Sequence, residues 1–329
     1  QYTFFSLLKG QVPRRFFPKI TLTILPAQKL SLDPKLLGRA RRRALSEQIY
    51  EVMVKMMFLT SPIEKTLFSS LLEARKLYGS FMPILEDGSR KTLTYAGLLL
   101  KIFTFSRHLA RKTTTDEIVG LMLPNTHGLI VSFWALQATG RMPALLNYTS
   151  GSSALLTACQ IGGIKHIFTA RQFIEKARLP DSIEVLKSHK IHIHYLEDEV
   201  KKLRLVDKFW GFYGMICPER AYQKAVPSEK PKEGCVMLFT SGSEGIPKGV
   251  ILSHLNLQAN RYQLASVVDF TMRDRVLNVL PLFHAFGLTA GMLLPLLSGI
   301  RAFHYVSPLH YRMVAELVYD ISATILFGT

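Results

Sequence analysis

The sequence of 329 residues predicts an α/β fold with mostly parallel sheets covered by helices. The first observation is that apolar runs of strand length alternate with helical stretches from about residue 117 onwards. Strands that are buried on both faces of a parallel sheet have this continuous apolar character. The second observation is the composition, in which 48% of the residues are hydrophobic and 20% are charged. Such a chain is globular and long enough to bury a sizeable core.

The N-terminal part differs from the rest, and we expect residues 1–60 and residues 61–329 to form two separate parts. Residues 20–24 alternate isoleucine or leucine with threonine, which predicts a strand that the next proline ends. A helix is expected over about 39–59, with a basic first turn and apolar residues along one side. A linker follows, and Pro62 is expected to begin the next helix.

Beyond residue 116 we expect strands and helices to alternate. The expected strands are 117–123, 143–147, 166–170, 191–196, 234–240, 249–252, 275–280, 300–306 and 323–327. The expected helices are one ending near 138, 152–161, one beginning at 171, 254–267, an apolar helix after 280, and 309–319. Residues 118–140 and 276–300 carry no charge and are long enough to cross a bilayer, but prolines and glycines inside each favour a strand, a turn and a buried helix.

The formal net charge of +17 is unevenly distributed. The segment Gln1–Tyr50 holds ten basic residues against two acidic ones. This basic segment is either a solvated face or a surface that binds an anionic membrane, an acidic protein or nucleic acid. Nucleic acid is the least favoured of these partners, because no motif with aromatic residues between the basic ones accompanies the charge. The three cysteines are far apart and lack C-x-x-C spacing, which favours unpaired thiols in a reducing compartment over a metal site.

The stretch FTSGSEGIPKGVILSH, residues 239–254, connects two apolar runs by a loop of small residues and glycines. Glycine lets the backbone approach a ligand, and consecutive amides in such turns form a concavity that binds anions. Hydroxyl groups and the ammonium of Lys248 would complement a phosphate there; the hydroxyls belong to Thr240, Ser241 and Ser243. The loop is not a Walker A motif, because proline precedes the lysine, and it lacks the first glycine of a nucleophile elbow. A plain glycine-rich hairpin explains the turn but not the hydroxyls together with Pro-Lys-Gly.

TSGSEGIPKG, residues 240–249, resembles the phosphate-binding loop of the adenylate-forming superfamily, which contains acyl-CoA synthetases, luciferases and adenylation domains of peptide synthetases. PLFHAFG, residues 281–287, and the segment 120–147 resemble two further parts of that superfamily. The resemblance implies the N-terminal region of an adenylate-forming enzyme, which uses ATP and Mg²⁺. It assigns the nucleotide phosphates to Thr240, Ser241, Gly242, Ser243, Glu244, Gly245, Lys248 and Gly249. It makes His284 a catalytic residue near the acyl group and the α-phosphate; the alternative is a buried histidine that caps a helix.

A narrower resemblance concerns bacterial bifunctional acyl-acyl carrier protein synthetase/2-acylglycerophosphoethanolamine acyltransferases. SGSEG with Glu244, NYTSG at residues 147–151 and SPLHYR at residues 307–312 are similar to their synthetase half. RRFFPKITLTILP, residues 14–26, is similar to the end of the acyltransferase domain that precedes it, so that residues 1–60 would be its C-terminal tail and linker. The resemblance implies activation of a long-chain fatty acid, transfer to acyl carrier protein and reacylation of a lysophospholipid. The implied place is an anionic membrane surface, the cytoplasmic face of the bacterial inner membrane, with no nucleic acid as partner.

Two other functions stay open, an acyl-CoA synthetase with coenzyme A as acceptor and a non-catalytic module that binds a lipid or a partner. None of the ten histidines has an aspartate five positions later, as the acyltransferase class requires, and later motifs of the adenylate-forming superfamily are not present. Both ends look cut, so we expect a fragment of a longer protein that completes neither reaction by itself. His192 and His194 alternate with isoleucine, which favours an exposed strand face over a metal site.

Overall fold

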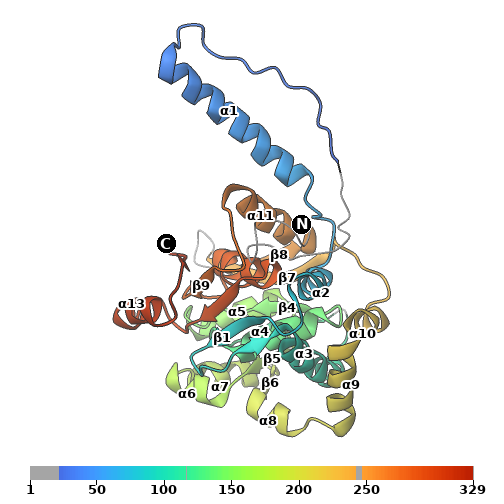
Figure 1. Ribbon diagram of the computed structural model, residues 1–329. Coiled ribbons are helices and arrows are strands. Elements are labelled where there is room, and N and C mark those ends of the chain that lie inside the picture. Colours follow the sequence, from blue (N-terminus) through green and yellow to red (C-terminus); the bar gives the residue numbers. More distant parts are fainter. Residues whose placement is uncertain (1–21, 116, 242–246, 329) are drawn as a thin grey trace.

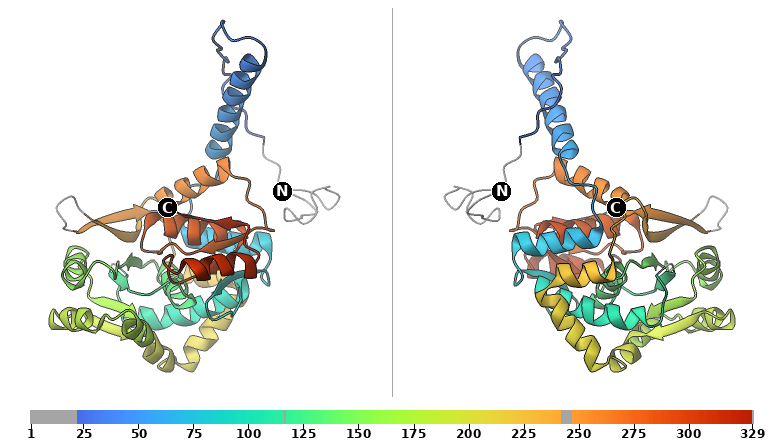
Figure 2. Two further views of the ribbon diagram at one scale, coloured as in Figure 1. Left: turned by 90° about the vertical axis from the view of Figure 1, so that its left-hand side faces the viewer. Right: turned by 90° about the vertical axis from the view of Figure 1, so that its right-hand side faces the viewer.

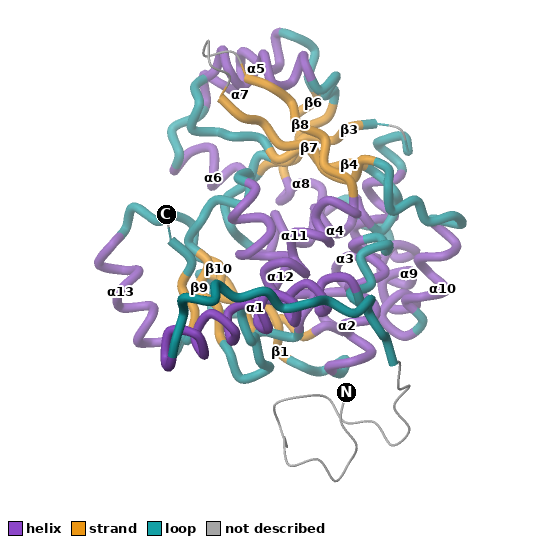
Figure 3. Tube along the Cα trace, turned by 90° about the horizontal axis from the view of Figure 1, so that it is seen from above, coloured by secondary structure: helices purple, strands orange, loops and turns teal. Residues whose placement is uncertain are grey.

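A computed structural model describes residues 22–115, 117–241 and 247–328. These residues form one sheet of six strands and one of five strands, with helices between and around them. Seen from above, α4 (His127–Gln137) and α12 (Leu294–Ser298) lie between the two sheets (Figure 3). The α/β fold with mostly parallel sheets is therefore confirmed.

The six-stranded sheet has the order β6-β5-β3-β4-β7-β8. Its strands are β3 (Ile118–Leu121), β4 (Met142–Leu145), β5 (His166–Thr169), β6 (His192–Tyr195), β7 (Gly234–Ser241) and β8 (Pro247–Ser253). All neighbours are parallel except β7 and β8, which form an antiparallel pair. The helices that connect these strands include α5 (Ser152–Ile161), α6 (Arg171–Lys176) and α7 (Pro180–Ser188). The parallel expectation holds except at the hairpin, because a short connection joins only antiparallel neighbours.

The five-stranded sheet has the order β11-β9-β10-β1-β2. Its strands are β1 (Pro83–Asp87), β2 (Leu93–Thr94), β9 (Arg275–Asn278), β10 (Arg301–His304) and β11 (Ile325–Leu326), with only β2 antiparallel. The space between the sheets is filled by an apolar core that includes α2 (Leu67–Tyr78) and α3 (Tyr95–Ala110). In it, the ring of Phe68 packs at 5.7 Å from Phe103 and at 6.3 Å from Trp134, between ring centroids.

Helix α1 (Gly38–Leu59) projects from this body and has no buried residue (Figure 1). It contacts α11 (His254–Val267), where Tyr50 Oη donates to the carbonyl oxygen of Val267 over 3.4 Å. At the end of the molecule opposite α1 lie α8 (Leu196–Lys201) and α9 (Leu205–Ile216), and α10 (Pro218–Ala225) leads from α9 back along the side of the body (Figure 1 and Figure 2). No helix in the described part of the chain is long and apolar enough to cross a membrane.

Two predicted elements are wrong in their described parts. The strand expected over 20–24 is absent at Leu22 and Ile24, which are 86% and 84% exposed and have no paired strand. Alternation alone does not make a strand, because the backbone groups need a neighbouring strand to bond. The helix expected from Pro62 begins instead at Leu67, where the Thr66 hydroxyl accepts a hydrogen bond from the Ser69 amide over 3.2 Å and caps the helix.

Candidate functional site

The hairpin of β7 and β8 carries the described part of the predicted phosphate loop. Thr240 stands directly opposite Lys248, and Phe239 opposite Gly249. Directly opposed residues of an antiparallel pair share one face of the sheet, so the Thr240 hydroxyl and the Lys248 ammonium lie on the same face. Both residues are exposed, whereas Phe239 is buried. The predicted residues Gly242, Ser243, Glu244 and Gly245 and the side chain of Ser241 lie outside the described residues.

PLFHAFG forms a tight turn after β9 that leads into the π-helix η1 (Gly287–Leu293). The amide of His284 donates to the carbonyl of Pro281 over 3.1 Å, and the amide of Leu288 donates to the carbonyl of His284 over 2.9 Å. A Cβ atom on Gly287 would overlap the carbonyl oxygen of Pro281, so the turn closes only with glycine there.

His284 is exposed, and within the described residues its imidazole has no hydrogen-bond partner. The alternative of a buried histidine that caps a helix is therefore wrong, and the assignment of His284 as a catalytic residue stays a prediction. The ring packs against Phe283 with 4.6 Å between centroids, and the resulting partial burial lowers its pKa, which favours the neutral form. The neutral, accessible imidazole of His284 in this turn can therefore form a hydrogen bond with a ligand.

Buried amide side chains connect this turn with the segment PNTHG, residues 124–128, which follows β3. Asn125, which follows β3, donates from Nδ2 to the carbonyl of Leu280 over 2.9 Å and accepts from the amide of Leu282 over 3.1 Å. Asn278, at the end of β9, accepts from the amide of Leu280 over 3.2 Å. Because both asparagines are buried, these bonds fix the backbone of the turn. Asn125 was not among the predicted site residues, although its place four residues after the end of a buried strand was a usable signal.

NYTSG reaches the same place from β4. The Tyr148 ring meets the Phe283 ring edge to face with 5.1 Å between centroids, and burial raises the pKa of the Tyr148 hydroxyl, which stays protonated. The parallel register pairs Leu145 with Leu238, so the chain leaves β4 at the same edge of the sheet at which β7 ends, next to Thr240. Thus the segments after β3, β4, β7 and β9 gather at the carboxyl ends of parallel strands, where ligands of open α/β sheets bind.

A second polar group lies beneath the turn at the carboxyl ends of β1 and β10. Asp87 Oδ2 accepts a hydrogen bond from the amide of His127 over 2.8 Å. His304 is fully buried, contacts Asn278 over 3.2 Å through Nδ1, and its Nε2 has no partner among the described residues. Burial lowers the pKa of His304 to about 3, so this histidine is neutral at physiological pH.

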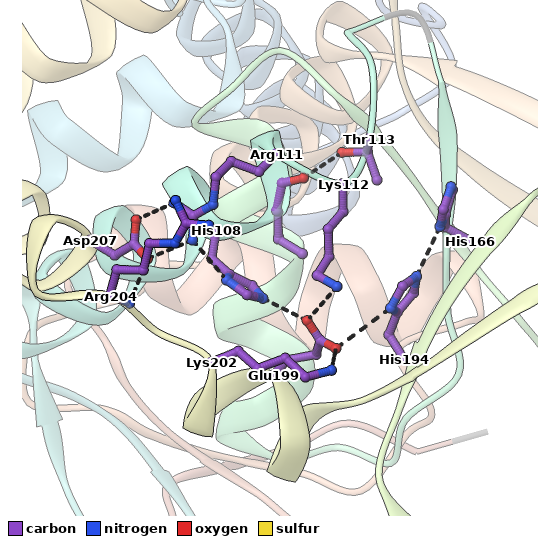
Figure 4. Close-up of polar contacts among 11 residues, drawn as sticks. His108, Arg111, Lys112, Thr113, His166, His194, Glu199, Lys202, Arg204 and Asp207 are labelled. Atoms are coloured by element: carbon purple, nitrogen blue, oxygen red, sulfur yellow. Dashed lines mark hydrogen bonds and ion pairs between the residues drawn. The ribbon is translucent and has the colours of Figure 1, made fainter.

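A third polar cluster lies at the other edge of the six-stranded sheet and is centred on Glu199 (Figure 4). This carboxylate is 2% exposed and contacts four side chains: His108 at 2.6 Å, Lys112 at 3.1 Å, Lys202 at 3.2 Å and His194 at 3.6 Å. Burial raises the pKa of Glu199, but the bonds that it accepts from His108, Lys112 and Lys202 outweigh this and hold its pKa at about 2. The Glu199 carboxylate is therefore ionised at physiological pH, and its role is to hold these side chains together.

The two strand histidines take different positions in this cluster. His192 is exposed, as expected, but His194 is largely buried, and its Nε2 lies 2.8 Å from His166 Nδ1. Burial, with the charge of Lys112, lowers the pKa of His194 to about 4. The expected exposed face is therefore wrong for His194, because α8 covers that side of β6 with Glu199. Within the described residues, no group of three histidine, cysteine, aspartate or glutamate side chains is placed to hold a metal ion.

The sequence pattern of the family described as "AMP-binding enzyme" matches residues 77–329. The chain belongs to the AMP-binding enzyme family. The matched residues include the hairpin of β7 and β8, the turn at residues 281–287 and the segments that contact this turn. The match therefore covers all the segments that gather at the carboxyl ends of the strands.

Individual relatives agree with this membership. An acyl-CoA ligase, SID4, of Ajellomyces capsulatus is 28% identical over 235 residues, which are 68% of this chain and 40% of that protein. A long-chain-fatty-acid–AMP ligase, FadD32, of Mycolicibacterium smegmatis is 25% identical over 66% of this chain and 32% of that protein. The chain thus spans less than half the length of these relatives. The o-succinylbenzoate CoA synthetase of Bacillus subtilis, solved with an acyl-adenylate intermediate, superposes with a TM-score of 0.62 at 18% identity over 78% of this chain and 60% of that one, which shows a shared fold.

Proposed function

We propose that the chain is part of an AMP-forming acid–thiol ligase that activates a fatty acid with ATP. The observation that carries this proposal is the contact between Tyr148 and Phe283, together with the bonds of Asn125 to the same turn. They bring three separate segments to the edge at which Thr240 and Lys248 share one face of the hairpin. The family membership supports the same chemistry, and one relative is named a long-chain-fatty-acid–AMP ligase.

The first reaction would join the fatty-acid carboxylate to ATP. A carboxylate oxygen attacks the α-phosphorus, the bond to the bridging oxygen breaks, and pyrophosphate leaves with the electron pair. Lys248 and the Thr240 hydroxyl suit the β- and γ-phosphates, because an ammonium and a hydroxyl on one face give charge-assisted bonds to phosphate oxygens. Mg²⁺ bound with the nucleotide would neutralise further phosphate charge.

His284 would lie beside the reacting groups. Its neutral imidazole can donate one hydrogen bond to a phosphate or carboxylate oxygen without adding a full charge, and Phe283 beside it gives an apolar wall for the acyl group. The rigid turn beneath it, held by Asn125 and closed at Gly287, would keep the ring in one position. Positioning of this kind, together with electrostatic stabilisation, is how a protein speeds such a transfer.

We further propose acyl carrier protein as the acceptor thiol and a lysophospholipid as the final acyl acceptor, at the cytoplasmic face of a bacterial inner membrane. The support is the resemblance of SGSEG, NYTSG and SPLHYR to the bifunctional enzymes, and the basic segment Gln1–Tyr50, which suits anionic lipid. The second candidate is an acyl-CoA synthetase, which the names of several relatives favour.

The test uses the complete enzyme that contains this chain. Lys248→Ala should lower fatty-acid-dependent pyrophosphate exchange by about tenfold to a hundredfold, because a charge-assisted contact contributes about 1.5–3 kcal/mol. Lys232→Ala, an exposed lysine just before β7, is the matched control and should exchange normally. Supplying acyl carrier protein or coenzyme A as thiol then separates the two candidates. If the wild-type enzyme exchanges no pyrophosphate with any fatty acid, the ligase proposal fails and a binding module remains.

A further inference from the structure

The outer side of α9 carries a stripe of exposed apolar side chains, here named the α9 stripe. It consists of Leu205, Val206, Phe209, Phe212, Tyr213 and Ile216. Phe209 is 72% exposed and Leu205 is 70% exposed. Their spacing of three and four residues puts them on one side of the helix. Large apolar side chains are normally buried, so that a continuous exposed stripe indicates an interaction surface.

The inner side of α9 is made of small residues, which explains why the large ones face outward. Gly211 and Gly214 are buried against α3. A Cβ atom on Gly211 would overlap the Thr104 hydroxyl, and one on Gly214 would overlap the Phe103 ring. The two helices therefore approach so closely that no larger side chain fits between them. A rotation of α9 that buried its aromatic residues would break this packing.

An ionic contact fixes the same orientation. Asp207 has no exposed side-chain surface and accepts two hydrogen bonds from the guanidinium of Arg111, the C-cap residue of α3, one of them over 2.7 Å (Figure 4). Arg107, one turn earlier on α3, lies 3.6 Å from the same carboxylate. Asp207 also accepts from the amide of Arg204 at the start of the helix, over 2.9 Å. The carboxylate thus holds α9 with its apolar side outward.

The exposed charges within residues 200–216 are positive, whereas the exposed Glu197 and Glu219 lie beyond the two ends of this segment. Between residues 200 and 216 the only acidic residue is Asp207, which faces inward, and four exposed cationic residues accompany it: Lys201, Lys202, Arg204 and Lys208. Trp210 lies below the stripe with the Arg107 guanidinium and the Lys224 ammonium at 5.9 Å and 5.8 Å from its ring. Aromatic and aliphatic residues on one side of a helix, flanked by lysine and arginine, are typical of helices that lie in the interface of a bilayer.

We propose that α9 docks the protein on an anionic phospholipid bilayer, with Phe209 and Phe212 among the acyl chains and the flanking lysines at the phosphates. Charge complementarity favours this occupant over a second copy of the chain, because a symmetric dimer through the stripe would bring the like charges of both copies together. The proposal is independent of the ligase function. It is also separate from the basic residues of α1, because α1 and α9 lie at opposite ends of the described structure (Figure 2).

The experiment is flotation of the whole chain with vesicles of phosphatidylcholine, with or without phosphatidylglycerol. Vesicles with phosphatidylglycerol should bind the chain, and Phe209→Gln with Phe212→Gln should lower binding roughly tenfold or more, since affinity follows the buried apolar area. Lys201→Gln with Lys208→Gln should lower it by about fivefold per lysine. Phe81→Gln is the matched control, because Phe81 is 82% exposed elsewhere on the surface. Leu205→Gln with Ile216→Gln is the second variant if the first fails to fold.

Insertion has its own readout in Trp210 fluorescence. Brominated lipid should quench Trp210, at the base of the stripe, and leave the fully buried Trp134 unaffected. Replacing Arg41, Arg42 and Arg43 of α1 by glutamine tests the basic segment separately, and this variant should still float with these vesicles. The proposal is overturned if the two phenylalanine changes leave flotation unaltered, if the α1 changes abolish it, or if the phenylalanine changes instead abolish a concentration-dependent dimer.

Discussion

Asn125 shows how one side chain can determine the shape of a site without touching a ligand. Its amide group makes hydrogen bonds with the carbonyl of Leu280 and the amide of Leu282, across a separation of 155 and 157 residues in the chain. It also donates to the carbonyl of Tyr305 over 3.1 Å. The side chain thus satisfies three backbone groups at once, and the carbonyl of Leu280 also accepts from Asn278 Nδ2 over 3.2 Å. His284 owes its position to this support.

Gly287→Ala should destabilise the protein by about 1–3 kcal/mol, because the added methyl group would overlap the carbonyl oxygen of Pro281 and the backbone would have to move. The free energy of unfolding in urea measures the loss. Gly88→Ala is the matched control, since nothing lies within 4 Å of the added Cβ there. Equal stability of both variants would contradict the close approach.

At the scale of single elements, pairing with a neighbour decides what each segment does. The register of β7 with β8 sets Thr240 beside Lys248, and a slip by one residue would turn every side chain of the hairpin to the other face. Helix α9 is oriented by Asp207 and two glycines rather than by its apolar residues, which is the reverse of an ordinary amphipathic helix.

Asp207→Asn should weaken the attachment of α9 to α3 and cost about 1.5–3 kcal/mol of stability, because charge-assisted hydrogen bonds to Arg111 are lost while the shape is kept. Hydrogen exchange should rise in α9 and change little in the strands of the six-stranded sheet. The exposed Asp269, changed to asparagine, is the control. Unaltered protection of α9 would show that the glycine packing suffices without the carboxylate.

At the scale of the whole molecule, the packing of the two sheets and the helices between them brings segments that are distant in sequence together at the carboxyl ends of the strands. The same packing buries histidines that have to stay neutral. Burial lowers the pKa of His254 to about 4, and its Nδ1 accepts a hydrogen bond from the amide of Leu67 at the start of α2 over 3.1 Å. His194 and His304 are buried with pKa values of about 4 and about 3.

These three histidines predict a stability that falls with acidification. Unfolded histidines bind protons near pH 6.5, whereas the folded ones stay neutral to about pH 4, so between these values the unfolded state holds more protons. Stability is then fully present above pH 6.5 and is lost as the pH falls, by up to about 1.4 kcal/mol per pH unit for each histidine.

Urea unfolding at a series of pH values between 7 and 5 measures this slope. His254→Gln should flatten it, because the amide oxygen of glutamine can still accept from Leu67 but does not titrate. His189→Gln, on an exposed residue, is the control. A slope that His254→Gln leaves unchanged would place the titration elsewhere.

The sequence by itself determined the elements whose signals are local. Most of the alternation of strands and helices from β3 to β11 follows from apolar runs and turn residues, but the helices α8, α9 and α10 between β6 and β7 were not predicted. Helix α11 has the predicted bounds, 254–267, because Ser253 caps its first turn. The motifs at residues 240–249 and 281–287 indicated the family for the same reason, since each is a continuous stretch. The antiparallel hairpin, the meeting of Tyr148 with Phe283, the bonds of Asn125 and the outward turn of α9 were decided only by the tertiary structure. All of these features depend on contacts between segments that are far apart in the chain, and no local periodicity encodes such contacts. Residues 22–24 form no strand for the same reason, because no strand in the described part of the chain pairs with them.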